Sequence, residues 1–116
     1  MQLAHASDAE IMAVVEPIMD NLMDASTAID YPRHIRDFTA RLKGMLSEDA
    51  LRSICVDYQA RRGFFAGREF VALFRRPDSI AVVWRQRFTK AAGDFVAELV
   101  LVEQDGAYRV HHVMVF

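Results

Sequence analysis

The strongest pattern in this sequence is an alternation of apolar residues that runs through its second half, from Gly67 to Phe116. A period of two is typical of strands, because successive side chains of a strand point to opposite faces of the sheet. Turn residues interrupt the alternation three times. The pattern predicts a curved antiparallel meander of four strands: Arg68–Arg75, Ile80–Phe88, Asp94–Glu103 and Tyr108–Val115.

The turns of this meander predict its register. A two-residue turn at Asp105-Gly106 gives four pairs: Gln104 with Ala107, Leu101 with Val110, Leu99 with His112, and Glu98 with Val113. Placing Phe88 opposite Phe95 gives two more: Trp84 with Leu99, and Arg85 with Glu98. A slip of one residue in the last strand would exchange His112 with His111, because it moves every side chain to the other face.

This register gives the sheet two unlike faces. We expect the inner face to collect Ile80, Val82, Trp84, Phe88, Phe95, Ala97, Leu99, Leu101, Tyr108, Val110, Met114 and Phe116. Gln86 and His112 are its two polar interruptions. The outer face mixes charged residues with the valines Val83, Val96, Val100, Val113 and Val115. So many valines on a solvated face favour a partner, and we expect a homodimer that forms through the sheet.

The first sixty residues carry a helical period and can cover the inner face. Ser7 and Glu10 have the spacing of a capping box, so a first helix is expected to begin at Asp8. Pro17 predicts a bend or a restart of this helix, because proline lacks an N–H donor and clashes with the preceding turn. The chain is expected to leave the first helix at Asp30-Tyr31-Pro32.

Two further helices are expected before the sheet. One follows Pro32 and ends at Gly44, with Ile35, Phe38, Leu42 and Met45 on one side. The other is capped by Ser47 and ends at Gly63, with Leu51, Ile54, Cys55 and Tyr58 pointing inward. The predicted fold class is α+β, with N-terminal helices packed on a curved four-stranded antiparallel meander.

Length and composition limit the function classes. A chain of 116 residues suits a single domain, here residues 1–116, and 53% hydrophobic against 26% charged residues is typical of a globular protein. The net charge of −2 disfavours nucleic-acid binding. No apolar run is long enough to span a membrane, and the single cysteine rules out an intramolecular disulfide. We therefore expect a cytoplasmic protein without a membrane anchor.

Three features together resemble one known superfamily: helices followed by a bent meander, the segment Gly63-Phe64-Phe65 before the sheet, and the run AVVWRQRF over residues 81–88. The chain resembles the nuclear-transport-factor-2-like superfamily, also called cystatin-like, which includes ketosteroid isomerase and scytalone dehydratase. The resemblance implies a cone whose open end is a pocket for a small apolar ligand, and dimerisation through the sheet. Its isomerases use a pocket tyrosine and carboxylic acids, and no motif here assigns those roles to residues of this chain.

His112 is the candidate catalytic residue, because the predicted register places it on the apolar face near Trp84, where burial can tune a base. Gln86 and Tyr58 are its expected hydrogen-bond partners, and both count with Trp84 as candidate ligand-binding residues. The alternative is a structural histidine whose ring nitrogens are satisfied by a carbonyl or a helix side chain. Adjacent histidines of a strand point to opposite faces, so His111 and His112 predict no metal site.

Phe64 is a further candidate for ligand binding. The arginines around it, Arg61, Arg62 and Arg68, suit a clamp for an anionic or aromatic ligand, or a solvated rim around core phenylalanines. Cys55 lies on an apolar helix stripe and is expected to be a buried structural thiol. No motif predicts a cofactor.

Three functional interpretations remain open at this level. The first is a non-catalytic dimeric domain that holds a small apolar or weakly anionic molecule, or serves as a scaffold, since the inner face has no matched acid and base. The second is a small acid-base isomerase or dehydratase with His112 as its base and Tyr58 or Gln86 polarising the substrate. The third is a subunit that binds another protein through the outer valines.

Overall fold

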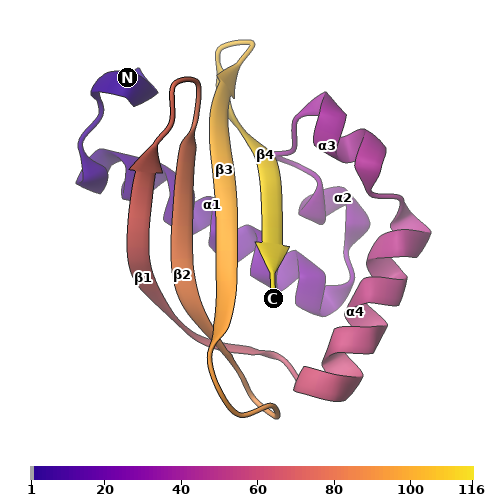
Figure 1. The fold of residues 1–116 in the computed structure, drawn as a ribbon. Coiled ribbons are helices and arrows are strands. Elements are labelled where there is room, and N and C mark those ends of the chain that lie inside the picture. Colours follow the sequence, from indigo (N-terminus) through magenta and orange to yellow (C-terminus); the bar gives the residue numbers. More distant parts are fainter. Residues whose placement is uncertain (1) are drawn as a thin grey trace.

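A computed structural model describes residues 2–116. Helices precede strands in the order η1 (Leu3–His5), α1 (Asp8–Ala28), α2 (Tyr31–His34), α3 (Ala40–Met45), α4 (Glu48–Arg62), β1 (Phe65–Arg75), β2 (Ile80–Phe88), β3 (Phe95–Gln104) and β4 (Ala107–Val115). The strands form one antiparallel sheet in the order β1-β2-β3-β4 (Figure 1). The predicted α+β class is confirmed, and the sheet is curved and open.

Helix α1 begins where the sequence predicts. The Ser7 hydroxyl accepts a hydrogen bond from the Glu10 backbone N–H, and the Glu10 carboxylate accepts one from the Ser7 N–H, which completes the capping box. The restart predicted at Pro17 does not occur, because α1 runs through it as one helix of 21 residues. Pro17 lies on the exposed side, where solvent can satisfy the Ala13 carbonyl that proline leaves without a donor.

The single helix predicted between Pro32 and Gly44 is wrong, since the structure divides this stretch into α2 and α3. The chain between them leaves the helical path to pair with β4. The Thr39 N–H donates to the Val110 carbonyl at 2.9 Å, and the Val110 N–H donates to the Asp37 carbonyl at 2.7 Å. The Thr39 hydroxyl then caps α3. These bonds satisfy backbone N–H and C=O groups at the edge of β4. They stabilise the chain more than a continued helix would.

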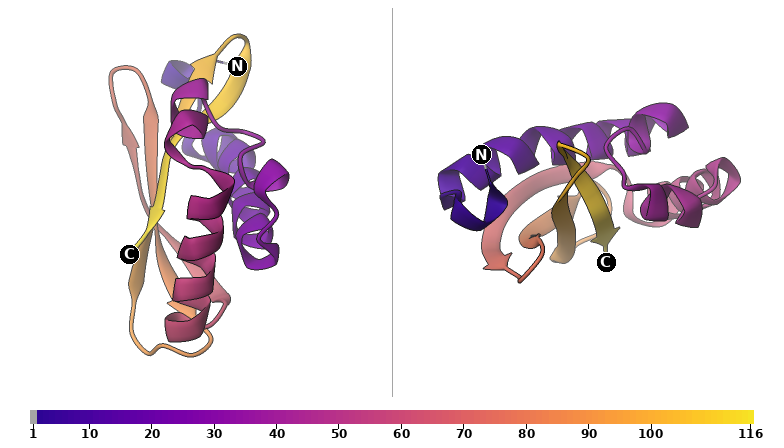
Figure 2. Two further views of the ribbon diagram at one scale, coloured as in Figure 1. Left: turned by 90° about the vertical axis from the view of Figure 1, so that its right-hand side faces the viewer. Right: turned by 90° about the horizontal axis from the view of Figure 1, so that it is seen from above.

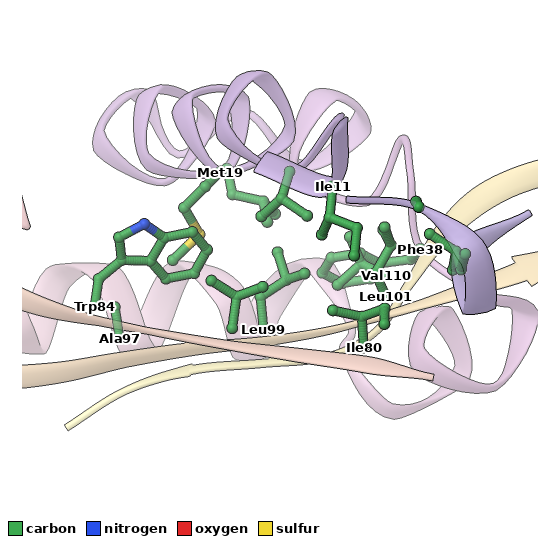
Figure 3. Close-up of a cluster of buried hydrophobic side chains, with 14 residues drawn as sticks. Ile11, Met19, Phe38, Ile80, Trp84, Ala97, Leu99, Leu101 and Val110 are labelled. Carbon is green, nitrogen blue, oxygen red and sulfur yellow. The ribbon is translucent and has the colours of Figure 1, made fainter. Parts of the chain in front are cut away.

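The main core lies between α1 and the inner face of the sheet. Ile11, Val15 and Met19 of α1 are fully buried and belong to one cluster with Val82 and Leu99 of the strands. Figure 3 shows the side chains of the two layers meeting in this cluster. Burial of each such side chain contributes about 1.5–3 kcal/mol, so this interface carries much of the stability of the fold.

The predicted register is correct at the last turn and wrong beyond it. Gln104 pairs with Ala107 and Leu101 with Val110, as expected. A bulge then leaves His111 unpaired in the ladder, so that Leu99 pairs with Val113 and Glu98 with Met114.

The bulge reverses the faces of the end of β4. Val113 and Val115 pack on the core, whereas Met114 and Phe116, predicted to be inside, are 50% and 52% exposed.

The register between β2 and β3 also differs from the prediction, but by two residues. Trp84 pairs with Ala97 instead of Leu99, and Arg85 with Val96 instead of Glu98. An even shift keeps each side chain on its face, so the inner face of these two strands is as predicted. The longer loop after Phe88 accounts for the shift, since Gln86 is the last residue of β2 paired with β3.

Two views in Figure 2 show the helices gathered on one side of the curved sheet and beyond its β4 edge. No element among residues 2–116 covers the outer face of the sheet. Among the same residues, no helix combines the length and the apolar character needed to cross a membrane.

Candidate functional site

A cavity of about 550 Å³ lies between the helices α1, α3 and α4 and strand β4, with Phe65 of β1 and Phe88 of β2 also in its lining. We call it the apolar cleft. Its walls are mainly apolar side chains: Met19, Leu22, Met23, Phe38, Leu42, Met45, Leu46, Leu51, Ile54, Phe65, Phe88, Val113, Met114 and Val115. A volume of this size and a lining of this kind are typical of small-molecule sites.

The position of α4 creates the apolar cleft. Ser47 caps its first turn, and Gly63 ends it with a positive φ of 84°. A Cβ at Gly63 would lie 2.4 Å from the Thr89 hydroxyl oxygen, so only glycine allows this close turn into β1. The C-terminal end of α4 is therefore held against the β2–β3 loop, while Met45 and Ile54 remain exposed along the rim.

Tyr58 takes part in a small polar cluster at the base of α4. Its hydroxyl lies 2.8 Å from the Ser26 hydroxyl oxygen, which in turn lies 3.4 Å from the Cys55 sulfur. Burial raises the pKa of Tyr58, so its hydroxyl stays protonated at neutral pH. Tyr58 and Ser26 line the apolar cleft, and Cys55 is a buried thiol as predicted.

His34 is the residue of the apolar cleft whose hydrogen bonding is incomplete. Burial lowers the pKa of His34, and a hydrogen bond to the Leu22 backbone opposes this shift only in part. The ring is therefore neutral at pH 7 and packs edge-on against Phe38, with centroids 5.5 Å apart. Its Nδ1 is buried without a hydrogen-bond partner among residues 2–116.

The predicted position of His112 beside Leu99 on the inner face is wrong. The bulge at His111 turns His112 to the outer face, where its Nε2 lies 2.8 Å from a carboxylate oxygen of Glu98. His111 lies instead beside Thr39, with Nδ1 3.2 Å from the hydroxyl oxygen. His112 still contributes to the rim of the apolar cleft, and a catalytic role for it stays a prediction.

A second cavity, of about 430 Å³, lies between α1 and β1, and we call it the Gln86 pocket. It is lined by Asp20, Asn21, Met23, Asp24, Thr27, Phe65, Ala66, Arg68 and Gln86. Gln86 is 1% exposed, and its Oε1 has no hydrogen-bond partner among the described residues. Gln86 therefore lines a different cavity from Tyr58 and His112, which both contribute to the apolar cleft.

The other predicted ligand-binding residues lie outside the linings of both cavities. Trp84 is buried in the core, and its indole N–H donates to Glu16 at 2.7 Å. Phe64 is about half exposed.

The three arginines that suit a clamp or a solvated rim do not share one site, because Arg61 and Arg62 line the apolar cleft and Arg68 lines the Gln86 pocket. Arg68 is bound to Glu16 and Asp20 of α1, while Arg61 is paired with Asp57. The guanidinium of Arg62 lies over the Phe95 ring, 4.7 Å from its centroid.

Sequence reasoning missed two residues of the apolar cleft, Ser26 and His34. Ser26 continues the apolar stripe of α1 at the spacing set by Leu22, and a polar residue on such a stripe is a signal that could have identified it. His34 gave no comparable signal, because the break between α2 and α3 positions it. Among residues 2–116, no group of three His, Cys, Asp or Glu side chains is placed to hold a metal ion.

Comparisons with known proteins establish similarity of fold only. No protein-family model and no curated protein matches the chain. The solution structure of RPA3114, a SEC-C motif containing protein from Rhodopseudomonas palustris, is similar with a TM-score of 0.57 at 12% identity, over 98% of each chain. Bd1075 of Bdellovibrio bacteriovorus is similar with a TM-score of 0.54 at 10% identity, over 95% of this chain and 42% of that one.

Proposed function

We propose that this protein binds a small, mainly apolar molecule in the apolar cleft and does not transform it. The observation that carries the proposal is a cavity of about 550 Å³ whose wall is formed chiefly by aliphatic, methionine and aromatic side chains. Met45 and Ile54 leave large apolar surfaces exposed at its rim, and an apolar ligand would remove that surface from water.

The polar groups of the apolar cleft suggest the chemistry of the ligand. Tyr58 and Ser26 already satisfy each other, whereas the Nδ1 of neutral His34 lacks a donor. A ligand hydroxyl or amide N–H can supply that donor if the imidazole turns toward the cleft on binding. The proposed ligand therefore has an apolar body and one hydrogen-bond donor.

Binding without catalysis is favoured over the isomerase or dehydratase interpretation. Acid-base catalysis needs an acid and a base within hydrogen-bond reach of one substrate. Of the three residues named for that role, Gln86 lies in the other cavity. Tyr58 and His112 both line the apolar cleft, but Tyr58 is bound to Ser26 and His112 to Glu98.

Thymol and its methyl ether test this proposal, because the two probes have similar bodies and only thymol donates a hydrogen bond. We expect thymol to bind saturably and the ether to bind about tenfold more weakly, the worth of one hydrogen bond in a shielded site. The His34→Phe variant should abolish the difference between the probes. Absence of saturable thymol binding by calorimetry would contradict the proposal.

A matched pair of variants locates the site. Ile54 and Val56 lie on the same helix and are 55% and 57% exposed, but only Ile54 lines the apolar cleft. Ile54→Glu should weaken thymol binding at least fivefold, since it places a charge against the ligand, whereas Val56→Glu should leave it unchanged. Equal effects of the two variants would place thymol elsewhere.

We also propose that two copies of the chain pair through the outer face of the sheet. Phe74, Val83, Val100 and Met114 lie there uncovered by any described element. Charged side chains of this face pair with one another, because Arg85 and Arg87 both pair with Glu69 and Asp94, and Glu98 bonds to His112. A face whose charges are paired can meet its own copy across a two-fold axis with little like-charge repulsion, which supports a second copy as the occupant.

Light scattering tests the dimer. The wild-type chain should have twice the monomer mass, and Val100→Arg should give monomers because two unpaired arginines would be buried near the axis. Val56→Arg, a matched change on exposed α4, should remain dimeric. A wild-type protein that is monomeric at high concentration would contradict this proposal.

A place in the nuclear-transport-factor-2-like superfamily is likewise our proposal. Helices that precede a curved meander, with a cavity between the two layers, support it. An experimental structure in which the four strands failed to superpose on members of that superfamily would contradict it. The buried free thiol of Cys55 supports a cytoplasmic location, which fractionation of cells that produce the tagged chain can test.

A further inference from the structure

Gln86, which lines the Gln86 pocket, carries a buried hydrogen-bond acceptor without a donor. The Gln86 Nε2 lies 2.9 Å from the Arg87 carbonyl oxygen, 3.2 Å from that of Ala66 and 3.4 Å from that of Gly67. The reversed amide would set its oxygen against these three carbonyl oxygens, so the network fixes the orientation. Oε1 is thus the atom left without a partner, and a buried unsatisfied acceptor costs about 1–3 kcal/mol.

The charges of the pocket favour a cation. Asp20 and Asp24 contribute two carboxylates to its lining, against the one guanidinium of Arg68. That guanidinium is already committed, with Nη2 2.6 Å from Glu16 and 2.7 Å from Asp20, and it lies over the Trp84 ring. An anion would meet the carboxylates without a free cation to pair with. Asp20 and Asp24 each pair with one arginine, but their side chains are 70% and 81% exposed and keep acceptor lone pairs that an ammonium group can use.

The rest of the lining is apolar on one side. Met23 and Phe65 form a wall that a hydrocarbon body can contact, and both also line the apolar cleft, so they separate the two cavities. We infer that the Gln86 pocket binds a protonated primary amine with a compact apolar body, its N–H groups donating to Gln86 Oε1 and to the carboxylates of Asp20 and Asp24. This site is independent of the ligand proposed for the apolar cleft.

Benzylammonium is the probe, and the neutral benzyl alcohol is its matched control. In nitrogen-15 NMR titrations of the full chain, benzylammonium should shift the side-chain amide of Gln86 and the backbone amide of Asp24 saturably. Benzyl alcohol should bind at least fivefold more weakly, because it lacks the charge. No saturable shift at Gln86 would overturn the inference, and shifts confined to Met45 and Ile54 would place the amine in the apolar cleft and overturn it equally.

Two exposed carboxylates at opposite ends of α1 provide matched variants, since each is paired with one arginine. Asp24 is paired with Arg33 at the pocket, and Asp8 with Arg75 far from it. Asp24→Asn should weaken benzylammonium binding about three- to fivefold, the effect of one exposed charge pair. Asp8→Asn should not change it.

Equal weakening by Asp24→Asn and Asp8→Asn would indicate attraction to the net charge alone and would overturn the site. Thymol binding is measured separately on the same samples. If thymol does not bind saturably but benzylammonium does, the proposed function is refuted and this inference stands.

Discussion

Helices α1 and α4 meet the sheet in different ways. Helix α1 buries Ile11, Val15 and Met19 completely against the inner face. Helix α4 contacts the sheet through a small cluster of its residues Leu51, Cys55 and Tyr58 with Phe88 of β2, and the apolar cleft lies between it and β4. The centre of the α1 interface is filled, with the Gln86 pocket at its β1 side. The α4 interface leaves apolar side chains available along the apolar cleft.

The difference separates stability from function within one small chain. Filled interfaces supply stability, because every apolar contact is already made. Ile54 of α4 and Met45 of α3 are exposed along the rim of the apolar cleft, and they leave apolar surface that a ligand can cover. We therefore expect substitutions at α1 to affect folding most, and substitutions at the α4 rim to affect binding most.

The largest expected loss in the free energy of unfolding comes from opening a cavity in the filled interface between α1 and the sheet. Leu99→Ala should lower the free energy of unfolding by about 3–5 kcal/mol, because Leu99 is fully buried and its loss opens a new cavity. Leu51→Ala should cost only about 2 kcal/mol, because Leu51 already lines the apolar cleft and its truncation enlarges an existing space. Urea unfolding of both variants tests this order, and equal losses would remove the distinction between the interfaces.

The pH dependence of stability sharpens the comparison at the cleft. Burial lowers the pKa of His34 in the folded chain, so the unfolded chain binds a proton first as the pH falls. The free energy of unfolding should therefore be highest above about pH 6.5, the ordinary pKa of histidine. As the pH falls from there, the free energy of unfolding should decrease until the pH is below the lowered pKa of the folded chain. For one such group, the free energy of unfolding changes by at most about 1.4 kcal/mol per pH unit.

His34→Phe should flatten this slope between about pH 6.5 and pH 5, where most carboxylates remain ionised. His5→Gln, a change at an exposed position, controls for the loss of a histidine. Urea unfolding at several pH values measures the slope. A slope that persists unchanged in His34→Phe would show that His34 is not its source.

The smallest of these effects concerns the helix caps. Ser7→Ala removes the capping box of α1 and should cost about 1 kcal/mol. Ser47→Ala removes the cap of α4 and should cost a similar amount or less, but hydrogen exchange should show local fraying there, next to the rim of the apolar cleft. Fraying of α1 instead of α4 would reverse the comparison.

The fold was largely predictable from local signals. The caps Ser7 and Ser47 mark the starts of α1 and α4, and the alternation from Ile80 to Phe88 gives the bounds of β2. These features depend on residues that are close in the sequence, so periodicity and capping rules can predict them.

The break between α2 and α3 and the bulge at His111 were not predictable in this way. Both arise from contacts between distant parts of the chain, where residues 37–39 pair with Val110 and where the His111 ring lies beside the Thr39 hydroxyl. Tertiary contacts of this kind override local propensity.

The candidate site depended on those same distant contacts, so less of it could be predicted. Gln86 and Tyr58, which were named as ligand-binding candidates because each is a polar side chain on an apolar face, each line a cavity, and their role in binding stays a prediction. Trp84 lines neither cavity, because packing under α1 and a bond to Glu16 bury it in the core. His112 was misplaced by the bulge, and His34 joined the apolar cleft through the helix break.

The most direct test of the central claim is to locate thymol on the protein by intermolecular nuclear Overhauser effects. We expect contacts from the methyl groups of thymol to the methyl groups of Met45, Ile54 and Val113, which line the apolar cleft. We expect none to the methyl groups of Val56 or Val83, which lie outside it. Contacts confined to the outer face of the sheet, with none to Ile54, would contradict the claim that α4 and β4 enclose a ligand site.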